Sequence, residues 1–133
     1  MVTSIKERAK YPGPYINLKG LTMAKENLVE SDRILEEMVR RLVAAFDPDH
    51  IYLYGSRARE EAGPDSDYDL MLVVSASQVP RYRRDQQAFR ALCGLGVPKE
   101  VIVLTRAEFE AGRKVTCSLP ATVLREGRLL YAA

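Results

Sequence analysis

Two aspartates, separated by one residue, are the side chains of this sequence best suited to chemistry. Asp67 and Asp69 stand directly before the apolar run 70–74. Because alternate residues of a strand point to the same face, the two carboxylates would lie about 7 Å apart on one side of a sheet. Oxygen ligands so placed can bind a divalent metal ion and hold it against a phosphate. A charged strand end in water is the other interpretation, but the acids would then repel each other by roughly 2 kcal/mol at an effective dielectric of about 20.

Gly55 and Ser56 follow a second apolar run, at residues 50–54, where a strand would turn into a helix. Glycine lets the backbone approach a phosphate closely, and the N–H groups at a helix N-terminus attract its negative charge. The Ser56 hydroxyl would add one donor. On their own, the two residues are equally typical of a turn and a helix cap, so their meaning depends on the aspartates that follow.

Residues 51–74 read IYLYGSRAREEAGPDSDYDLMLVV. This stretch resembles the signature of the nucleotidyltransferase superfamily related to DNA polymerase beta, in which Gly-Ser is followed by Asp-x-Asp, and it is most similar to the minimal nucleotidyltransferase branch. The resemblance implies an α/β (α+β) nucleotidyltransferase fold, with a small mixed sheet flanked by helices. It also implies that Asp67 and Asp69 hold two Mg²⁺ ions, or Mn²⁺, while Gly55 and Ser56 hold the phosphates of ATP or another nucleoside triphosphate.

The superfamily uses a third carboxylate on a later, adjacent strand. The candidate here is Glu100, which opens the apolar part of VPKEVIVLT. Glutamate replaces the more usual aspartate and moves the acid outward by one methylene, which affects metal geometry more than metal binding. The resemblance implies a catalytic and metal-binding role for Glu100, and a strand-end glutamate is the structural alternative.

Arg57 and Arg59 follow the Gly-Ser pair in a run, Gly-Ser-Arg-Ala-Arg, that is frequent in this branch. The resemblance implies contacts with the triphosphate, and pairing with Asp65, Asp67 or Glu61 is an equally good interpretation. Glu60 stands where many relatives have glycine, so the loop that leaves the motif is expected to be stiffer than usual.

The rest of the chain predicts the elements that position these residues. Residues 1–25, which contain the helix-breaking sequence Pro-Gly-Pro, form an N-terminal extension, and the nucleotidyltransferase domain is expected over 26–133. Apolar periodicity predicts a helix from about Glu26 to Phe46. Thr105 and Glu108 form a capping-box pattern that opens another helix. The remaining expected elements are strands over 50–54, 68–74 and 100–104, a short helix from 56 to about 61, a helix over 80–92, and a last short helix to 126 followed by a strand over 128–131.

The predicted helix 80–92 carries a basic cluster, defined as Arg81, Arg83, Arg84 and Arg90. Such a cluster can dock nucleic acid or an acidic partner. No aromatic stacking platform accompanies it, so a solvated helix face is the favoured interpretation. Glu108 and Glu110 are likewise expected on a helix surface.

Composition excludes several classes of function. The 133 residues are 47% hydrophobic and 29% charged with a net charge of +2, as expected of one ordinary globular domain. No apolar run is long enough to cross a membrane and no secretory signal is evident, so a cytoplasmic protein is expected. Two cysteines cannot build a disulfide framework, and the single histidine, His50, cannot build a multi-histidine zinc site and is expected at a strand end.

The resemblance implies transfer of a nucleoside monophosphate, expected to be AMP from ATP, to a hydroxyl group with release of pyrophosphate. Relatives that modify small molecules carry an added helical domain that a chain of this size does not accommodate, so the acceptor is expected on a partner protein. The resemblance implies a small helical HEPN-type partner and a toxin–antitoxin pair. A non-catalytic module that neutralises its partner by contact and a transferase acting on a small molecule are the alternatives, and the sequence does not decide between a monomer and a homo-oligomer.

Overall fold

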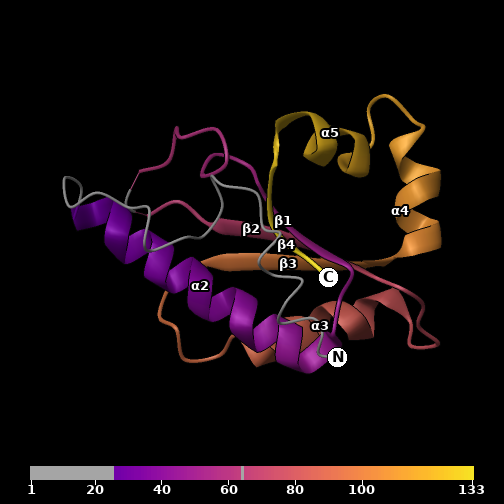
Figure 1. The fold of residues 1–133 in the computed structure, drawn as a ribbon, viewed down its shortest axis with the longest axis horizontal. Coiled ribbons are helices and arrows are strands. Elements are labelled where there is room, and N and C mark those ends of the chain that lie inside the picture. The colour runs from indigo at the N-terminus through magenta and orange to yellow at the C-terminus, as the bar shows by residue number, and fades with distance from the viewer. Residues whose placement is uncertain (1–25, 64) are drawn as a thin grey trace.

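The computed structural model describes residues 26–63 and 65–133, whose four helices surround a four-stranded mixed sheet (Figure 1). The expected α+β class is confirmed. The extension predicted over 1–25 lies outside the described residues, and the domain boundary at 26 stays a prediction. In chain order the elements are α2 (Glu26–Phe46), β1 (His50–Tyr54), β2 (Tyr68–Val74), α3 (Arg81–Ala91), β3 (Lys99–Thr105), α4 (Arg106–Arg113), α5 (Leu119–Glu126) and β4 (Arg128–Ala132).

The sheet has the strand order β3-β2-β1-β4. Strand β1 pairs antiparallel with both β2 and β4, and its pairing with β4 shifts register between Ile51 and Tyr52. Strands β2 and β3 are parallel and are joined through α3. The central strands are therefore β1 and β2, while β3 forms one edge of the sheet beside the predicted acids.

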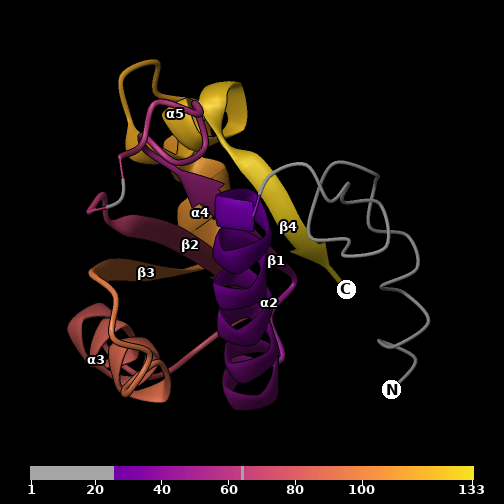
Figure 2. The same ribbon diagram turned by 90° about the vertical axis from the view of Figure 1, so that its left-hand side faces the viewer.

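Helices cover both faces of the sheet, as the two views in Figures 1 and 2 show. One core lies between the sheet and helices α2 and α3, and the second lies between the sheet and helices α4 and α5. Residues Leu70 and Leu72 of β2 point into the first core, whereas Met71 and Val73 point into the second. A strand buried on both faces has no polar alternation, which explains the continuous apolar run that follows Asp69.

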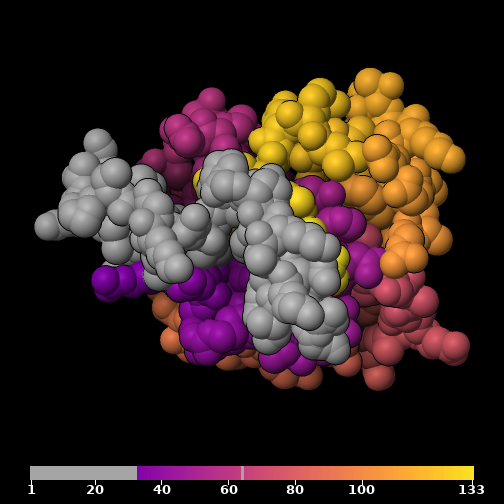
Figure 3. All heavy atoms as spheres, viewed as in Figure 1, coloured from indigo at the N-terminus to yellow at the C-terminus, as the bar shows by residue number. Residues whose placement is uncertain are grey.

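The second core is closed from outside by α4 and α5, whose surfaces adjoin each other in Figure 3. The predicted capping box opens α4: the Thr105 hydroxyl accepts from the Glu108 backbone N–H at 3.2 Å, and the Glu108 carboxylate accepts from the Thr105 N–H at 2.9 Å. None of the described helices is both long and apolar enough to span a bilayer.

The short helix predicted from Ser56 to Glu61 was wrong. Residues 56–60 form successive turns, closed by backbone bonds from Arg59 N–H to the Gly55 carbonyl and from Glu61 N–H to the Ser56 carbonyl. Glu60 has a φ of 61°, in the left-handed region, and a residue in that conformation ends a right-handed helix. The loop therefore has one turn of helical character and no extended helix N-terminus.

The interpretation of the basic cluster as a solvated face was wrong for Arg84, which is 5% exposed. Its guanidinium donates to the Val103 carbonyl at 2.8 Å and to the Glu108 carboxylate at 2.9 and 3.1 Å. The neighbouring Asp85 accepts from the Val103 N–H at 2.8 Å. Arg84 and Asp85 of α3 thus form hydrogen bonds with both outward-facing backbone groups of Val103 on the edge strand. Glu108 both caps α4 and holds the Arg84 guanidinium.

Candidate functional site

Asp69 lies between two other polar side chains on neighbouring strands. The register places it directly opposite Tyr54 on β1 and opposite Glu100 on β3. All three residues occupy the sheet face that continues into the second core, because Met71 and Ile102 follow two positions later in their strands. Parallel pairing of β2 with β3 therefore brings together two acids that are distant in the sequence, as the predicted third-carboxylate role of Glu100 requires.

The electrostatics of this cluster reflect its excess of negative charge. Burial raises the pKa of the half-buried Asp69 carboxyl, and the charges of Glu100 and Asp67 raise it further. The pKa of Tyr54 is raised as well, first by burial and then by the charges of Glu100 and Asp69. Within residues 26–63 and 65–133, none of the three carboxylates forms an ion pair or a side-chain hydrogen bond. The cluster therefore holds repulsion that a cation would relieve.

Gly55 adjoins the cluster at the end of β1. Its φ is 77°, a conformation that side chains other than glycine rarely adopt. A Cβ at this position would overlap the Oδ2 atom of Asp69 and lie 3.3 Å from its Cγ. The glycine is thus required both by its backbone conformation and by the close approach of the carboxylate. Ser56, the predicted phosphate donor, is half-buried in the turn that follows.

The two predicted nucleotide-binding arginines contact other groups in and around the loop. Arg57 donates from Nε to the Ser66 carbonyl at 3.1 Å, and its guanidinium lies 3.9 Å from the centre of the Tyr68 ring. Arg59 donates to the Glu61 carboxylate at 2.9 Å and lies 3.8 Å from that of Glu126. The structure therefore brings neither arginine onto the carboxylate cluster, and both connect segments of the chain around it.

The donor atoms of Asp67, Asp69 and Glu100 are of the hard oxygen type that Mg²⁺ and Mn²⁺ prefer. As the side chains stand, no group of three or more histidine, cysteine, aspartate or glutamate residues in the described ranges is close enough to hold a metal ion. Asp67 and Glu100 are exposed, so their carboxylates can change rotamer without disturbing either core. The unpaired charge and the ligand chemistry fit a divalent cation, and the metal role of these residues stays a prediction.

Tyr54 is the site residue that sequence reasoning did not single out. Its signal was available in principle, because Tyr54 ends the strand directly before Gly55, and an antiparallel neighbour would place it beside an acid of β2. The register itself could not be read from the sequence, since it depends on the turn geometry between the two strands. His50, at the start of the same strand, is half-buried and stacks on Tyr52, as expected of a strand-end residue.

Comparison with known proteins identifies relatives of this architecture. The nucleotidyltransferase domain family model matches residues 32–130. A crystal structure from Sulfolobus solfataricus, described as a nucleotidyltransferase, is 21% identical, with a TM-score of 0.57 over 84% of this chain and 93% of that one. A toxin–antitoxin structure with AMP-PNP is 19% identical, with a TM-score of 0.49 over 74% of this chain and 73% of that one. A search of curated protein sequences gives no significant match.

Proposed function

The chain belongs to the nucleotidyltransferase domain family, and from this premise we propose that it transfers AMP from ATP to a hydroxyl group on a partner protein. The observation that supports the proposal most is the pairing of Asp69 with Glu100 across β2 and β3, with Asp67 close enough to raise the pKa of Asp69. In the reaction, the acceptor oxygen forms a bond to the α-phosphorus of ATP, the bond to the β-phosphate oxygen breaks, and pyrophosphate leaves.

Asp67, Asp69 and Glu100 are the residues that would hold Mg²⁺, or Mn²⁺ in its place. When bound, two such ions would neutralise the triphosphate and lower the pKa of the acceptor hydroxyl. Glu100 is the exposed acid on the edge strand, so it is assigned to the acceptor side of the cluster, where it orients the hydroxyl. The proton released from the hydroxyl passes to a carboxylate of the cluster and then to water.

Gly55 and Ser56 are assigned to the β- and γ-phosphates, because the glycine leaves no side chain between the backbone and the acids. Arg59 is the arginine better placed to reach a triphosphate. Its contacts with Glu61 and Glu126 are exposed ion pairs, which contribute little and exchange readily. Arg57 is assigned to holding the loop through Ser66 and Tyr68.

A partner protein is proposed as the acceptor because the acids are open to solvent. Asp67 and Glu100 are exposed, so an acceptor as large as a protein can reach them. The assignment of this partner to a HEPN-type protein, and of the pair to a toxin–antitoxin system, is supported by the resemblance of residues 51–74 to minimal nucleotidyltransferases.

The test uses α-labelled ATP with proteins that co-purify with the chain, identified by mass spectrometry. We expect Mg²⁺-dependent labelling of one partner, loss of labelling in Asp69→Asn, and wild-type labelling in Arg83→Gln, a matched surface change on α3. Calorimetric titration should show that ATP binds with Mg²⁺ and more weakly with EDTA. Equal ATP affinity in both buffers, or neutralisation of the partner without any label, would contradict the proposal and favour a contact inhibitor. Label on a small molecule alone would contradict the protein acceptor.

A further inference from the structure

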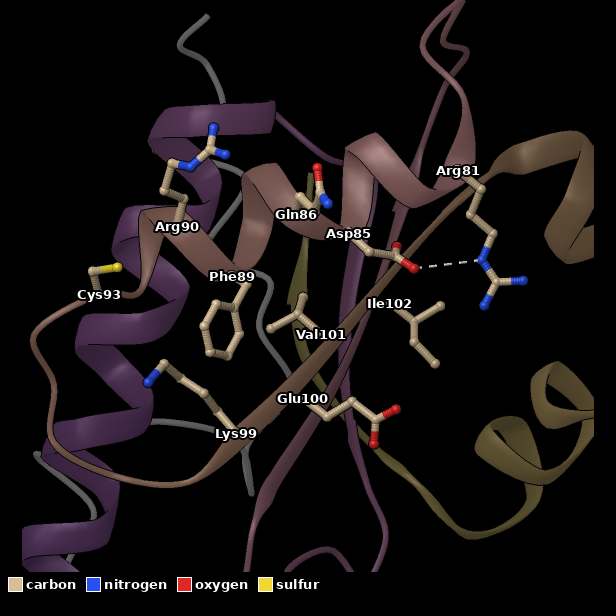
Figure 4. Close-up of a pocket in the computed structure, with 10 residues that line it drawn as sticks. All are labelled: Arg81, Asp85, Gln86, Phe89, Arg90, Cys93, Lys99, Glu100, Val101 and Ile102. Carbon is tan, nitrogen blue, oxygen red and sulfur yellow. Dashed lines mark ion pairs between the residues drawn. The ribbon is translucent and has the colours of Figure 1, made fainter.

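An open groove of about 720 Å³ lies between α3 and the edge strand β3, and Glu100 is among the residues that line it (Figure 4). Its described lining includes Phe89 and Arg90 from α3 and the first residues of β3. Figure 4 shows Phe89 and Lys99 on one side of the strand and Glu100 and Ile102 on the other. The groove thus leads from the outer edge of the sheet to the face that carries the acids.

Some outward backbone groups of β3 have hydrogen-bond partners and others do not. Residues of a strand alternate in the direction of their backbone groups, and those of Val103 point outward, to Arg84 and Asp85. The N–H of Thr105, two residues later, is also directed outward and donates to Glu108. By the same alternation the N–H and C=O of Val101 point outward, and among the described residues neither has a partner beyond the strand.

The unpaired part of the edge borders the groove. Val101 is one of the lining residues, immediately after Glu100 in the strand. Val101 is 5% exposed, but its N–H and C=O have no partner among the described residues and border the groove. An unpaired donor and acceptor on an edge strand can pair with an extended chain. If one residue of the added chain pairs with Val101, the next residue of that chain points its side chain to the opposite face of the sheet. Glu100 and Asp69 lie on that face.

The charge of the groove is asymmetric. At the end of the groove near Asp85, one oxygen of that carboxylate accepts from the Val103 N–H, and the other lies 3.7 Å from the Arg81 guanidinium. At the other end, Arg90 forms no ion pair with the described residues, and the Lys99 ammonium lies 5.1 Å from the Phe89 ring centre and 3.1 Å from the Val97 carbonyl. Two cations beside a half-exposed aromatic ring fit an acidic side chain with an apolar neighbour.

We propose that this groove binds the acceptor as an extended polypeptide segment, hydrogen-bonded to Val101, with an acidic residue at Arg90 and Lys99 and the acceptor hydroxyl directed to Glu100. The inference rests on the proposed transferase activity and specifies how its protein substrate is held. Hydrogen bonds to the Val101 backbone would give affinity for a segment that has no folded surface of its own. Arg90 and Lys99 would select acidic sequences, and the residue that carries the hydroxyl would reach Glu100.

The experiment measures transfer from α-labelled ATP to short synthetic peptides that carry one tyrosine, serine or threonine flanked by acidic, neutral or basic residues. We expect acidic peptides to be preferred. Arg90→Glu and Lys99→Glu should each lower kcat/KM for acidic peptides by about tenfold or more, mainly through KM, because like charges then face each other. Arg83→Glu makes the same charge change on α3 outside the groove and should leave transfer unchanged.

Val101→Pro tests the backbone contact. Proline removes the outward N–H of residue 101 but leaves the hydrogen bonds between β3 and β2 intact. It is therefore compatible with an edge strand. Transfer to peptides should fall while ATP affinity is retained. Because Val101 is buried, folding is checked by circular dichroism, and the two charge reversals decide the question if this variant does not fold.

The outcomes separate the two proposals. Transfer to peptides that is equal in the wild type, Arg90→Glu and Lys99→Glu, or transfer only to RNA or to small alcohols, would overturn the groove assignment while leaving nucleotidyl transfer intact. Retained Mg²⁺-dependent ATP binding without transfer to any peptide would also overturn it. If the wild-type protein neither binds ATP nor transfers label, the proposed function is wrong, and the groove assignment is wrong with it.

Discussion

Gly55 and Asp69 are fitted to each other: the Asp69 carboxylate occupies the space in which a Cβ of residue 55 would lie. The contact joins the end of β1 to the start of β2, at the point where the Gly-Ser pair meets the acid cluster. A side chain at 55 would displace the carboxylate from this position. The Gly-Ser pair and the Asp-x-Asp pair of the sequence signature are therefore sterically coupled through this contact.

Gly55→Ala should destabilise the protein by about 2–4 kcal/mol, because alanine adds a left-handed backbone penalty and a clash with Asp69. Gly94→Ala is the matched control: its φ is 88°, and a Cβ there meets nothing within 4 Å. It should cost only about 1–2 kcal/mol. Urea unfolding measures both. In an Asp69→Ala background the cost of Gly55→Ala should fall toward that of the control, and an unchanged cost would rule out the steric coupling.

Asp69→Asn should leave the stability of the metal-free protein unchanged or raise it by up to about 2 kcal/mol, since it removes the repulsion that Glu100 and Asp67 exert on the Asp69 charge. Mg²⁺-ATP should stabilise the wild type by mass action and the variant far less. Thermal melts of both proteins with and without Mg²⁺-ATP give the comparison. A lower melting point of the metal-free variant, with the ligand shift preserved, would assign Asp69 a structural role instead.

Glu100→Gln should leave ATP binding nearly intact and lower transfer about a hundredfold or more, because its proposed task is to orient the acceptor hydroxyl in the transition state. ATP affinity is measured by calorimetry and transfer with α-labelled ATP. Glu110→Gln, an exposed change on α4, is the control. Transfer at the wild-type rate by Glu100→Gln would leave this residue as a strand-end glutamate.

Glu108→Gln should destabilise the protein by about 1–2 kcal/mol, because it leaves the buried Arg84 guanidinium without its anionic partner, while solvent at the exposed carboxylate limits the loss. The hydrogen bond to Arg84 is the main cause that lowers the Glu108 pKa from 4.5 to about 2. A carboxyl whose pKa is lower in the folded state contributes stability above its unfolded pKa and loses it as the pH falls through the folded one. The difference from the wild type should therefore shrink between pH 4.5 and about 2.

Urea denaturation at several pH values checks this prediction. Glu110→Gln is the control, because the Glu110–Arg113 pair is exposed and its loss should cost less than about 0.5 kcal/mol. A pH-independent difference between Glu108→Gln and the wild type would show that packing, and not charge, links α3 to α4.

Glu60→Gly should stabilise the protein by up to about 1 kcal/mol, because glycine adopts the φ of 61° without the penalty that glutamate pays. Glu60→Ala removes the same charge and keeps the Cβ, so it separates the backbone effect from the electrostatic one. Thermal unfolding of both variants is compared. Equal stability of Glu60→Gly and Glu60→Ala would show that the loop relaxes the strain.

Local sequence signals were sufficient for most elements. The apolar period of α2, the run that forms β2 and the capping box of Thr105 and Glu108 each depend on residues close in the sequence, and each was confirmed. The turn at Ser56 was misread because Ser-Arg-Ala-Arg has good helix propensity, while the left-handed Glu60 depends on the tertiary setting of the loop.

The partners of arginines were harder to predict than the elements that carry them. Arg83 and Arg84 are adjacent and chemically identical. Arg84 is buried and donates hydrogen bonds to the Val103 carbonyl and the Glu108 carboxylate, whereas Arg83 is exposed. The helical period indicates that they face different directions, but only the packing of α3 beside β3 determines which one meets the sheet. Likewise, no local pattern places Arg57 on Tyr68.

The pairing of β1 with β4 has a consequence for folding kinetics. Strand β1 is central in the sheet but meets β4 from the far end of the described chain, so this contact closes a long loop and forms late if local contacts form first. Until β4 docks, the apolar edge of β1 is exposed in any collapsed intermediate and can pair with another molecule. Aggregation during refolding should therefore depend on the docking rate of β4.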